Sequence, residues 1–467
     1  MVYFKNHLSE INKSKYLGGI IMNTNKTELF NEKLPMKKLL PLGLQHVLAM
    51  YAGALAVPMI VGAAIGLKPD QIAYLLAADL FTCGIATLIQ SYGFGKHVGV
   101  KLPVIMGCSF VSVAPMITIG KASGLPVIYG AVICAGVFVV IISYFFGKLL
   151  KFFPPVVTGT VIMIVGLSLI PVAINDAAGG YGPTHGNPKN LLLAGIVLVF
   201  IFILNKYFKG FMQATSVLLG LVFGTIVASF MGMVDMTNVV NAGWFKVVTP
   251  FYFGLPKFEI GPIITMCLIS LILMIEAVGV FIGVGDICDR KLKKEEIVSG
   301  LRGEGIAQIF GGIFNSFPYT TFSQNVGLVA LSGVKSRYVT VCSGIILICL
   351  GIIPKVAALA TVIPSSVLGG ATLAMFGMVA VSGIKILSAV DFTKTGNMLT
   401  IALAVSIGLT SKLAPGTFDQ LPYAIKFILD DGIVAGSIVA IFGNLFFNYK
   451  EMKESEIKVA APIKASN

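Results

Sequence analysis

Charged side chains are scarce in this sequence. Asp, Glu, Lys and Arg make up 12% of the 467 residues, whereas 56% are hydrophobic and the mean hydropathy is +0.91. Soluble domains carry roughly 25% charged residues, so this composition excludes a soluble globular enzyme and a disordered chain. It also excludes an ordinary nucleic-acid-binding protein, which carries its positive charge on a polar surface. This chain has little polar surface despite its formal charge of +13.

Motifs of enzymes and metal sites are also missing. Histidine occurs only four times, and none of the seven cysteines lies in a Cys-x-x-Cys pair or at zinc-ligand spacing. The sequence contains no P-loop and no Gly-x-Ser-x-Gly elbow. We therefore expect no catalytic residue, no metal and no cofactor, and we interpret the cysteines as small core residues.

Long apolar runs are abundant instead. The hydrocarbon core of a bilayer, about 30 Å thick, is crossed by roughly 20 apolar residues in a helix, so these runs predict an all-α membrane protein. We identify fourteen candidate spans, at residues 39–66, 70–94, 103–118, 124–147, 154–175, 190–207, 212–233, 258–284, 295–314, 320–333, 337–352, 355–384, 396–411 and 424–448. The segments 103–118 and 320–333 are short for a complete span.

Basic residues are distributed unevenly between alternate loops. With the N-terminus inside, the inner loops carry fourteen Lys and Arg and the outer loops seven, while the tails 1–38 and 449–467 add eleven. Short cytoplasmic loops are enriched in Lys and Arg. The pattern therefore predicts a plasma-membrane protein with both termini cytoplasmic. The tail 1–38 has no apolar run long enough for a signal peptide, and we expect it to be disordered.

Two motifs occur twice at similar separations. Residues 154–159 (PPVVTG) resemble residues 364–369 (PSSVLG), 210 residues later, and Pro103–Ser109 corresponds to Pro318–Gln324, 215 residues later. With seven spans per copy, the second copy enters the membrane from the opposite side, which is typical of transporters. The alternative is a chance likeness in membrane sequence rich in Pro and Gly.

The short segments 103–118 and 320–333 occupy matching positions in the two copies. Interrupted hydrophobic segments at such positions indicate a ligand site, because irregular backbone at membrane depth is tolerated only inside protein or beside a cavity. We expect Ser109 and Gln324 to face each other near the middle of the membrane. Their backbone N–H and C=O groups should be free to bind a polar, planar ligand.

Four ionisable residues lie within apolar segments: His46, Asp79, Glu276 and Glu304. Ionisable residues inside a membrane are costly and usually functional. Glu276 is the strongest candidate because its flanks are almost entirely apolar, although a purely structural carboxylate remains the alternative. Glu304 could instead pair with Arg302, and His46 could be a hydrogen-bonded packing residue. Asp79 is expected to cap an unwound turn.

Consecutive amides are the most specific feature of the sequence. Gln324 and Asn325 lie in a membrane segment, where amides need partners. Such a pair can join helices, but here it follows Pro318 in a short segment, which favours a ligand. The full pattern comprises Ser323-Gln324-Asn325-Val326-Gly327, Ser332-Gly333, Gln45-His46, Gly107-Cys108-Ser109-Phe110, Glu276 and Asn315–Phe322.

This pattern resembles the signature of the nucleobase–ascorbate transporters, also called the nucleobase–cation symporter 2 family. The resemblance covers residues 39–448, and residues 317–327 are most similar to bacterial xanthine and uric acid permeases. It implies fourteen spans in a 7+7 inverted repeat, with two short strands in spans 3 and 10. It also implies a core domain at 39–150 and 251–353, and a gate domain at 151–250 and 354–448. A homodimer through the gate domain is expected.

The resemblance also implies roles for individual residues. Glu276 and Gln324 would hold the base, and Phe110 would offer a backbone group and an aromatic face. The remaining implied substrate-site residues are Ser109, Ser323, Asn325 and His46, and the implied proton-coupling residues are Glu276, Glu304 and His46. The family usually has Asp where Glu304 stands, which puts the proton-coupling geometry in doubt.

The chemistry of the candidate residues is consistent with a purine. A xanthine presents N–H donors beside carbonyl acceptors; a carboxylate accepts from the donors, and a Gln amide both donates and accepts. Burial disfavours the charged form of a carboxylate, so Glu276 or Glu304 could carry a coupled proton. We therefore expect proton-coupled uptake of xanthine or uric acid.

Three alternatives stay open: another nucleobase (uracil, guanine or hypoxanthine), an inorganic anion, or a membrane enzyme. Uracil carriers have His where this chain has Val280, and pyrimidine members tend to have Glu in place of Gln324. An anion carrier would more plausibly place basic or helix-end groups at the site, and no Lys or Arg is evident at mid-membrane depth.

Overall fold

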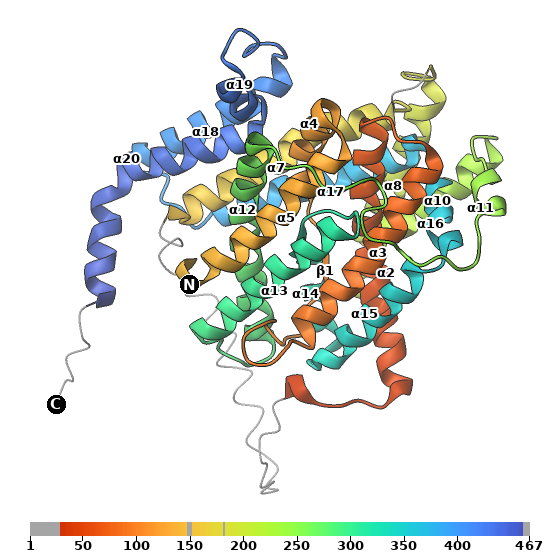
Figure 1. The fold of residues 1–467 in the computed structure, drawn as a ribbon, viewed down its shortest axis with the longest axis horizontal. Coiled ribbons are helices and arrows are strands. Elements are labelled where there is room, and N and C mark those ends of the chain that lie inside the picture. The colour runs from red at the N-terminus through yellow and green to blue at the C-terminus, as the bar shows by residue number, and fades with distance from the viewer. Residues whose placement is uncertain (1–28, 147–151, 181–182, 461–467) are drawn as a thin grey trace, which may run out of the picture.

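The computed structural model describes residues 29–146, 152–180 and 183–460 (Figure 1). Residues 1–28 and 461–467, which belong to the two predicted tails, lie outside the described residues. The first half contains η1 (Leu29–Asn31), α2 (Met36–Ala64), α3 (Pro69–Ser91), β1 (Met106–Cys108), η2 (Phe110–Ser112), α4 (Val113–Ser123), α5 (Leu125–Ile142), η3 (Ser143–Phe145), α7 (Pro155–Ala177), α8 (Pro188–Tyr207), α9 (Phe211–Ala214), α10 (Ser216–Phe230) and α11 (Thr237–Asn241).

The second half has a corresponding order of long and short elements. It contains α12 (Ile260–Ile287), α13 (Lys294–Ile313), β2 (Tyr319–Thr321), α14 (Gln324–Ser332), α15 (Arg337–Gly351), α16 (Pro354–Thr361), α17 (Ser365–Leu387), α18 (Thr395–Leu413), α19 (Tyr423–Asp430) and α20 (Gly432–Ala460). The helices α7 and α17 each have 23 residues and begin 210 residues apart.

Nine helices of the described residues are long and apolar enough to cross a membrane, which makes the chain a multi-pass membrane protein. They are α2, α3, α5 with η3, α7, α8, α12, α17, α18 and the first part of α20. Together α15 and α16 make a tenth candidate, bent by 80°. The predicted spans 103–118 and 320–333 each consist of a three-residue strand followed by a short helix. The segment 295–314 forms the full-length α13, but this helix carries several charged residues.

Two predicted spans are broken in ways that the apolar pattern does not show. Residues 355–384 form two helices, α16 and α17, and Pro364 stands at the N-cap of the second. Residues 424–448 divide at Asp431, whose Oδ1 accepts hydrogen bonds from the backbone N–H groups of Ile433 and Val434 at 3.0 and 3.1 Å. A side-chain acceptor at this position starts a new helix, so α20 begins independently of α19.

The helices form two packed groups, one around the strand pair and one around the pair α7 and α17. The strand pair packs against α2, α3, α12 and α13, and β1 lies near the middle of the molecule in Figure 1. In the first group α15 packs on α3 and α2, and α13 packs on α5. In the second group α7 packs along α17, with α8, α10, α18 and α20 around this pair. The short α16 packs on α3 and therefore lies with the first group.

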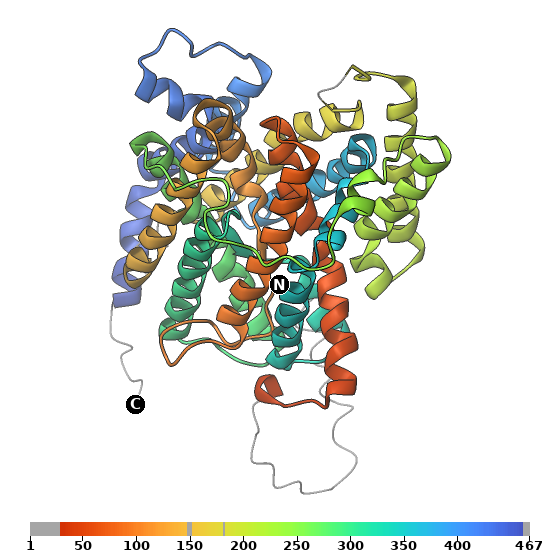
Figure 2. The same ribbon diagram turned by 45° about the vertical axis from the view of Figure 1, so that its right-hand side comes forward.

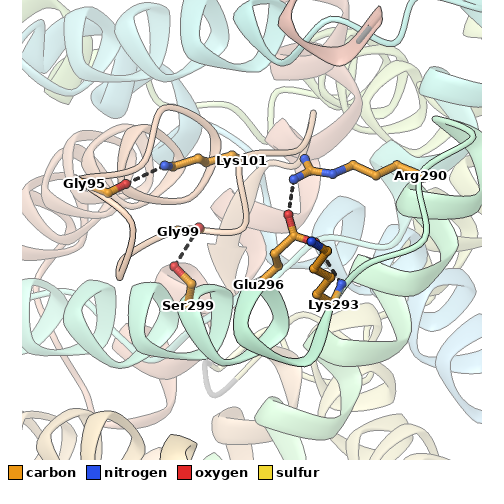
Figure 3. Close-up of polar contacts among 7 residues, drawn as sticks. All are labelled: Gly95, Gly99, Lys101, Arg290, Lys293, Glu296 and Ser299. Atoms are coloured by element: carbon orange, nitrogen blue, oxygen red, sulfur yellow. Dashed lines mark hydrogen bonds and ion pairs between the residues drawn. The ribbon is translucent and has the colours of Figure 1, made fainter. Parts of the chain in front are cut away.

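The connecting segments lie at two ends of the molecule. Figure 2 shows η1, the start of α2 (red) and the loop 92–105 (orange) at the lower end, and the segment around α19 (blue) at the upper end. The lower loop is anchored to α13 (Figure 3): the Ser299 hydroxyl donates to the Gly99 carbonyl at 3.1 Å. Nearby, Arg290 pairs with Glu296, which also accepts from the Lys293 N–H at 2.8 Å. These contacts hold basic residues at this end in fixed positions.

Glycine permits two close helix crossings in the first group. A Cβ on Gly84 of α3 would lie 2.5 Å from the carbonyl oxygen of Gly344 in α15. The crossing of α5 and α13 is alike, because a Cβ on Gly136 or Gly305 would lie 2.7 Å from the other's carbonyl oxygen. Both distances are too short for any side chain, so these backbones are in direct contact.

We expect Gly84→Val to destabilise the protein by about 2 kcal/mol or more, because overpacking a close contact typically costs about 1–3 kcal/mol. The measurement is the thermal unfolding midpoint of the detergent-solubilised protein. Gly195→Val in α8 is the matched control, since a Cβ there meets no atom within 4 Å. Equal midpoints for the two variants would contradict the close crossing.

Candidate functional site

The two short strands meet in the interior of the first helix group. β1 and β2 pair antiparallel, with Met106 opposite Thr321 and Cys108 opposite Tyr319. The pairing continues on both sides, because the Ser109 N–H donates to the Pro318 carbonyl at 3.0 Å and the Phe322 N–H donates to the Ile105 carbonyl at 2.9 Å. All six strand residues are buried. The structure therefore places the predicted segments 103–118 and 320–333 side by side.

Ser109 does not have the free backbone that the sequence suggested. Its N–H is bonded to Pro318, and its carbonyl accepts from the Ser112 hydroxyl at 2.8 Å. Its side-chain oxygen accepts from the Val111 N–H at 3.1 Å, which caps η2. The expectation of open backbone groups at Ser109 is wrong, because the strand pairing uses its N–H and the turn into η2 uses its carbonyl.

Ser323 and Gln324 are exposed although they follow a buried strand. Gln324 is the first residue of α14, and the first N–H groups of a helix lack partners within the helix. Within the described part of the chain, neither the Ser323 nor the Gln324 side chain forms a recorded hydrogen bond. A Cβ on Gly327, one turn further on, would meet no atom within 4 Å. The start of α14 therefore borders open space.

Glu276 is half-buried in the middle of α12 and forms no recorded hydrogen bond among the described residues. Gly279 follows it by three residues and shares its side of the helix; a Cβ there would also meet no atom within 4 Å. The helix packs against β2, η2 and α14. Glu276 is thus an acid without a hydrogen-bond partner among the described residues, on a helix that borders the strand pair and α14.

Glu304 of α13 is hydrogen-bonded to β2. Its Oε1 accepts hydrogen bonds from the Thr321 N–H at 3.1 Å and from the Thr321 hydroxyl at 2.8 Å. Its Oε2 is buried and has no hydrogen-bond partner among the residues that the structure describes. Pairing with Arg302 is not observed, because that guanidinium lies over the Tyr144 ring and donates to the His97 carbonyl.

His46 and Asn325 bind each other and connect α2 to α14. The Asn325 Nδ2 lies 3.2 Å from His46 Nδ1 and 2.9 Å from the His46 carbonyl oxygen. With the amide nitrogen donating, Nδ1 accepts and the ring proton of a neutral His46 lies on Nε2. Both side chains are buried, and Asn325 Oδ1 has no hydrogen-bond partner within the described ranges.

Phe110 lies where the two helix groups meet. Its ring packs edge-on against Phe376 of α17, with the ring centroids 5.5 Å apart and the planes at 78°. A Cβ on Gly53 of α2 would lie 3.0 Å from the Phe322 ring and 3.7 Å from Phe110, so both rings approach this glycine. Phe110 is therefore a predicted site residue that contacts the second helix group.

Asp79 was misread from the sequence. It lies in the middle of the continuous helix α3, not at an unwound turn, and it is completely buried. Its carboxylate accepts hydrogen bonds from Cys108, Ser316 and Tyr319. The signal that could have identified it is an acidic residue at mid-span. Two of the cysteines read as plain core residues, Cys83 and Cys108, donate to it.

Other candidate sites are few. The described residues contain no group of three or more His, Cys, Asp and Glu placed to hold a metal ion. A cavity of about 360 Å³ opens between α3, α11 and α16, and none of the predicted site residues lines it.

Comparison with known proteins assigns this chain to a family. Residues 37–417 match the model of a permease family. Uric acid permease PucJ of Bacillus subtilis is 49% identical over 89% of this chain and 94% of its own length. Nucleobase transporter PlUacP of Paenibacillus larvae is 50% identical over 91% and 98%, and the xanthine permease of B. subtilis is 49% identical over 88% and 94%.

Solved structures of more distant proteins share the fold. The transmembrane domain of the cyanobacterial bicarbonate transporter BicA superposes with a TM-score of 0.58 at 17% identity, covering 89% of this chain and all of that one. SLC26A9 gives 0.59 at 13% identity, covering 88% and 66%. At such low identity the likeness concerns architecture alone. The sequence matches carry the assignment, and the chain belongs to the permease family that includes the uric acid and xanthine permeases, the nucleobase–cation symporter 2 family.

Proposed function

We propose that this permease takes up a purine nucleobase, xanthine or uric acid, through a site formed by α12, α14 and the strand pair. The observation that carries the proposal is Glu276, a half-buried acid in the middle of a membrane helix without a hydrogen-bond partner among the described residues. An acid at such depth is usually functional. Relatives named as uric acid permease, nucleobase transporter and xanthine permease, each about half identical, support the choice of substrate.

The groups around the open space match the edge of a xanthine. The Glu276 carboxylate accepts from ring N–H donors, while the Gln324 amide donates to a carbonyl and accepts from an N–H. The first N–H groups of α14 and the Ser323 hydroxyl add donors for a carbonyl oxygen. The Phe110 ring offers an apolar face for the planar base. His46 and Asn325 shape this site by holding α14 against α2.

The anion alternative draws on the shared fold with BicA, a bicarbonate transporter, and with SLC26A9, an anion transporter. The residues around the proposed site favour a base instead. Its charged side chains are acidic, Glu276 and Glu304, and carboxylates accept the hydrogen bonds that the ring N–H groups of a purine donate, whereas a simple inorganic anion offers few such donors. Uracil, guanine and hypoxanthine remain the alternative substrates within the family.

We propose that a proton accompanies the base and that Glu276, Glu304 and His46 are the candidate groups to carry it. Glu304 is suited to this role because its Oε2 is buried without a partner, a position where a proton would remove an uncompensated charge. Its other oxygen stays bonded to Thr321. A change in protonation at Glu304 would therefore alter the hydrogen bonds that this residue accepts from Thr321 in β2.

We propose that the two helix groups act as a core and a gate that move against each other, in a chain with fourteen membrane segments arranged as two inverted copies. Reciprocal packing supports the duplication, because α3 crosses α15 as α13 crosses α5, and each crossing joins two glycines. The core would comprise residues 39–150 and 251–353, and the gate 151–250 and 354–448. The packing of α16 on α3 favours a boundary after α16, near Ile363. We further propose the plasma membrane as location, cytoplasmic termini, and a homodimer formed through the gate.

Radiolabelled xanthine uptake in cells lacking purine permeases tests the substrate and the coupling. Unlabelled xanthine and urate should compete more strongly than uracil or hypoxanthine. An uncoupler should lower accumulation by more than about tenfold, since one charge crossing 100 mV is worth about 2.3 kcal/mol. Uracil as the strongest competitor would overturn the purine assignment. Accumulation that is unaffected by the uncoupler would overturn proton coupling.

A further inference from the structure

Asp79 is a completely buried acid that the proposed transport site does not use. Its Oδ1 accepts three hydrogen bonds, from Cys108 Sγ at 2.6 Å, Ser316 Oγ at 2.7 Å and the Tyr319 hydroxyl at 3.1 Å. Its Oδ2 accepts a longer one from Cys83 Sγ at 3.7 Å. All four donors are neutral, and the Asp79 carboxylate fixes the positions of all four side chains by accepting their hydrogen bonds.

Two of these donors belong to opposite strands. Cys108 is the last residue of β1, Tyr319 is the first residue of β2, and the two are paired directly in the sheet. Tyr319 is bonded further to Thr82 of α3, and Ser316 lies 2.6 Å from the Tyr319 hydroxyl. Asp79 therefore ties both strands to α3 at one end of the pair.

Glu304 holds the other end of the same pair. It binds Thr321, which lies opposite Met106 and whose hydroxyl is 3.3 Å from the Met106 sulfur. Asp79 and Glu304 also occupy the same place in matching helices, because α3 begins at Pro69 and α13 at Lys294, a separation of 225 residues that also separates the two acids. Both helices start with the same capping arrangement, Lys68 with Gln71 and Lys293 with Glu296.

We propose that Asp79 is a positioning residue for substrate binding, the counterpart of Glu304 at the opposite end of the strand pair. By holding Cys108 it fixes where the chain leaves β1, immediately before Ser109 and Phe110. By holding Tyr319 it fixes where β2 begins, ahead of Ser323 and Gln324. The acid acts as an acceptor of hydrogen bonds and not as a carrier of the transported proton. This inference rests on the proposed site at Phe110 and Gln324.

The test compares Asp79→Asn with Asp79→Leu in the xanthine uptake assay. Asparagine keeps an oxygen for the three donors at Oδ1, whereas leucine leaves buried donors unpaired, which is costly. Asp79→Asn should keep the KM within about threefold of wild type, and Asp79→Leu should raise it by about tenfold or more with kcat largely retained. The order in which methylated xanthines inhibit xanthine uptake should change only in Asp79→Leu. Displaced site residues would alter the positions of the base at which a methyl group can be accommodated.

A purely structural role would lower the amount of protein and the maximal rate while leaving the KM and the competitor profile unchanged, and that result overturns the proposal. Equal loss of transport in both variants also overturns it, because the charge would then matter more than the acceptor. If Asp79→Leu does not reach the membrane, Tyr319→Phe and Ser316→Ala remove one donor each and should raise the KM by about threefold; a wild-type KM in both is the contrary result. Wild-type uptake is measured first, so failure of the proposed substrate is seen separately.

Discussion

Replacing Glu276 by glutamine should abolish xanthine uptake while the protein still reaches the membrane in normal amount. The carboxylate accepts hydrogen bonds at both oxygens, whereas an amide presents an N–H₂ group to the donors of the base. Two facing donors repel and leave buried groups unpaired. We expect kcat/KM to fall by about a hundredfold or more, equivalent to about 2.7 kcal/mol of lost stabilisation.

The matched control for this substitution is Glu295→Gln, which makes the same chemical change at an exposed position in the first turn of α13. It should transport as wild type. Immunoblotting of membranes and the elution profile of the solubilised protein report whether Glu276→Gln is inserted and folded. Normal uptake by a correctly inserted Glu276→Gln would show that the base binds elsewhere.

Gln324→Glu should have an effect of similar size. The exchange removes the amide donor, so the carbonyl of the base loses its hydrogen-bond partner. It also adds a second acid to a site that already contains Glu276, and the two carboxylates repel each other. We expect kcat/KM for xanthine to fall by about a hundredfold or more. Initial uptake rates at several xanthine concentrations provide the measurement, together with competition by uracil.

Gln213→Glu in α9 is the appropriate comparison, because it adds the same charge to an exposed residue outside the proposed site. If both glutamates lowered uptake equally, the effect would lie in the overall charge of the protein and not in substrate recognition. If Gln324→Glu transported xanthine normally, Gln324 would not contribute to substrate binding.

The sequence was informative wherever an apolar pattern or a residue type has a single physical explanation. Repeated apolar runs identify a membrane protein, and the apolar flanks of Glu276 make this acid a candidate that stays a prediction. The paired short segments were predicted from their length and from the matching motifs that begin at Pro103 and Pro318. The structure places these segments beside each other through β1 and β2.

Features that depend on distant partners were not predictable. Nothing next to Asp79 in the sequence shows that Cys108, Ser316 and Tyr319 will converge on it. The free backbone expected at Ser109 failed for the same reason, because its partner Pro318 lies 209 residues away. The break at Asp431 was missed because the predicted span 424–448 was drawn through Asp430 and Asp431, although such acids are a signal for the start of a helix.

The strand pair has a consequence for the order in which the molecule is made. β1 is complete at Cys108, but its partner begins only at Tyr319, in the second half of the chain. At about 5–20 residues per second of synthesis, the ribosome needs roughly ten to forty seconds to cover this interval. During that time the N–H and C=O groups of β1 have no strand to pair with, which is costly in a membrane interior. The first half must therefore wait, incompletely folded, for a segment that has not yet been translated.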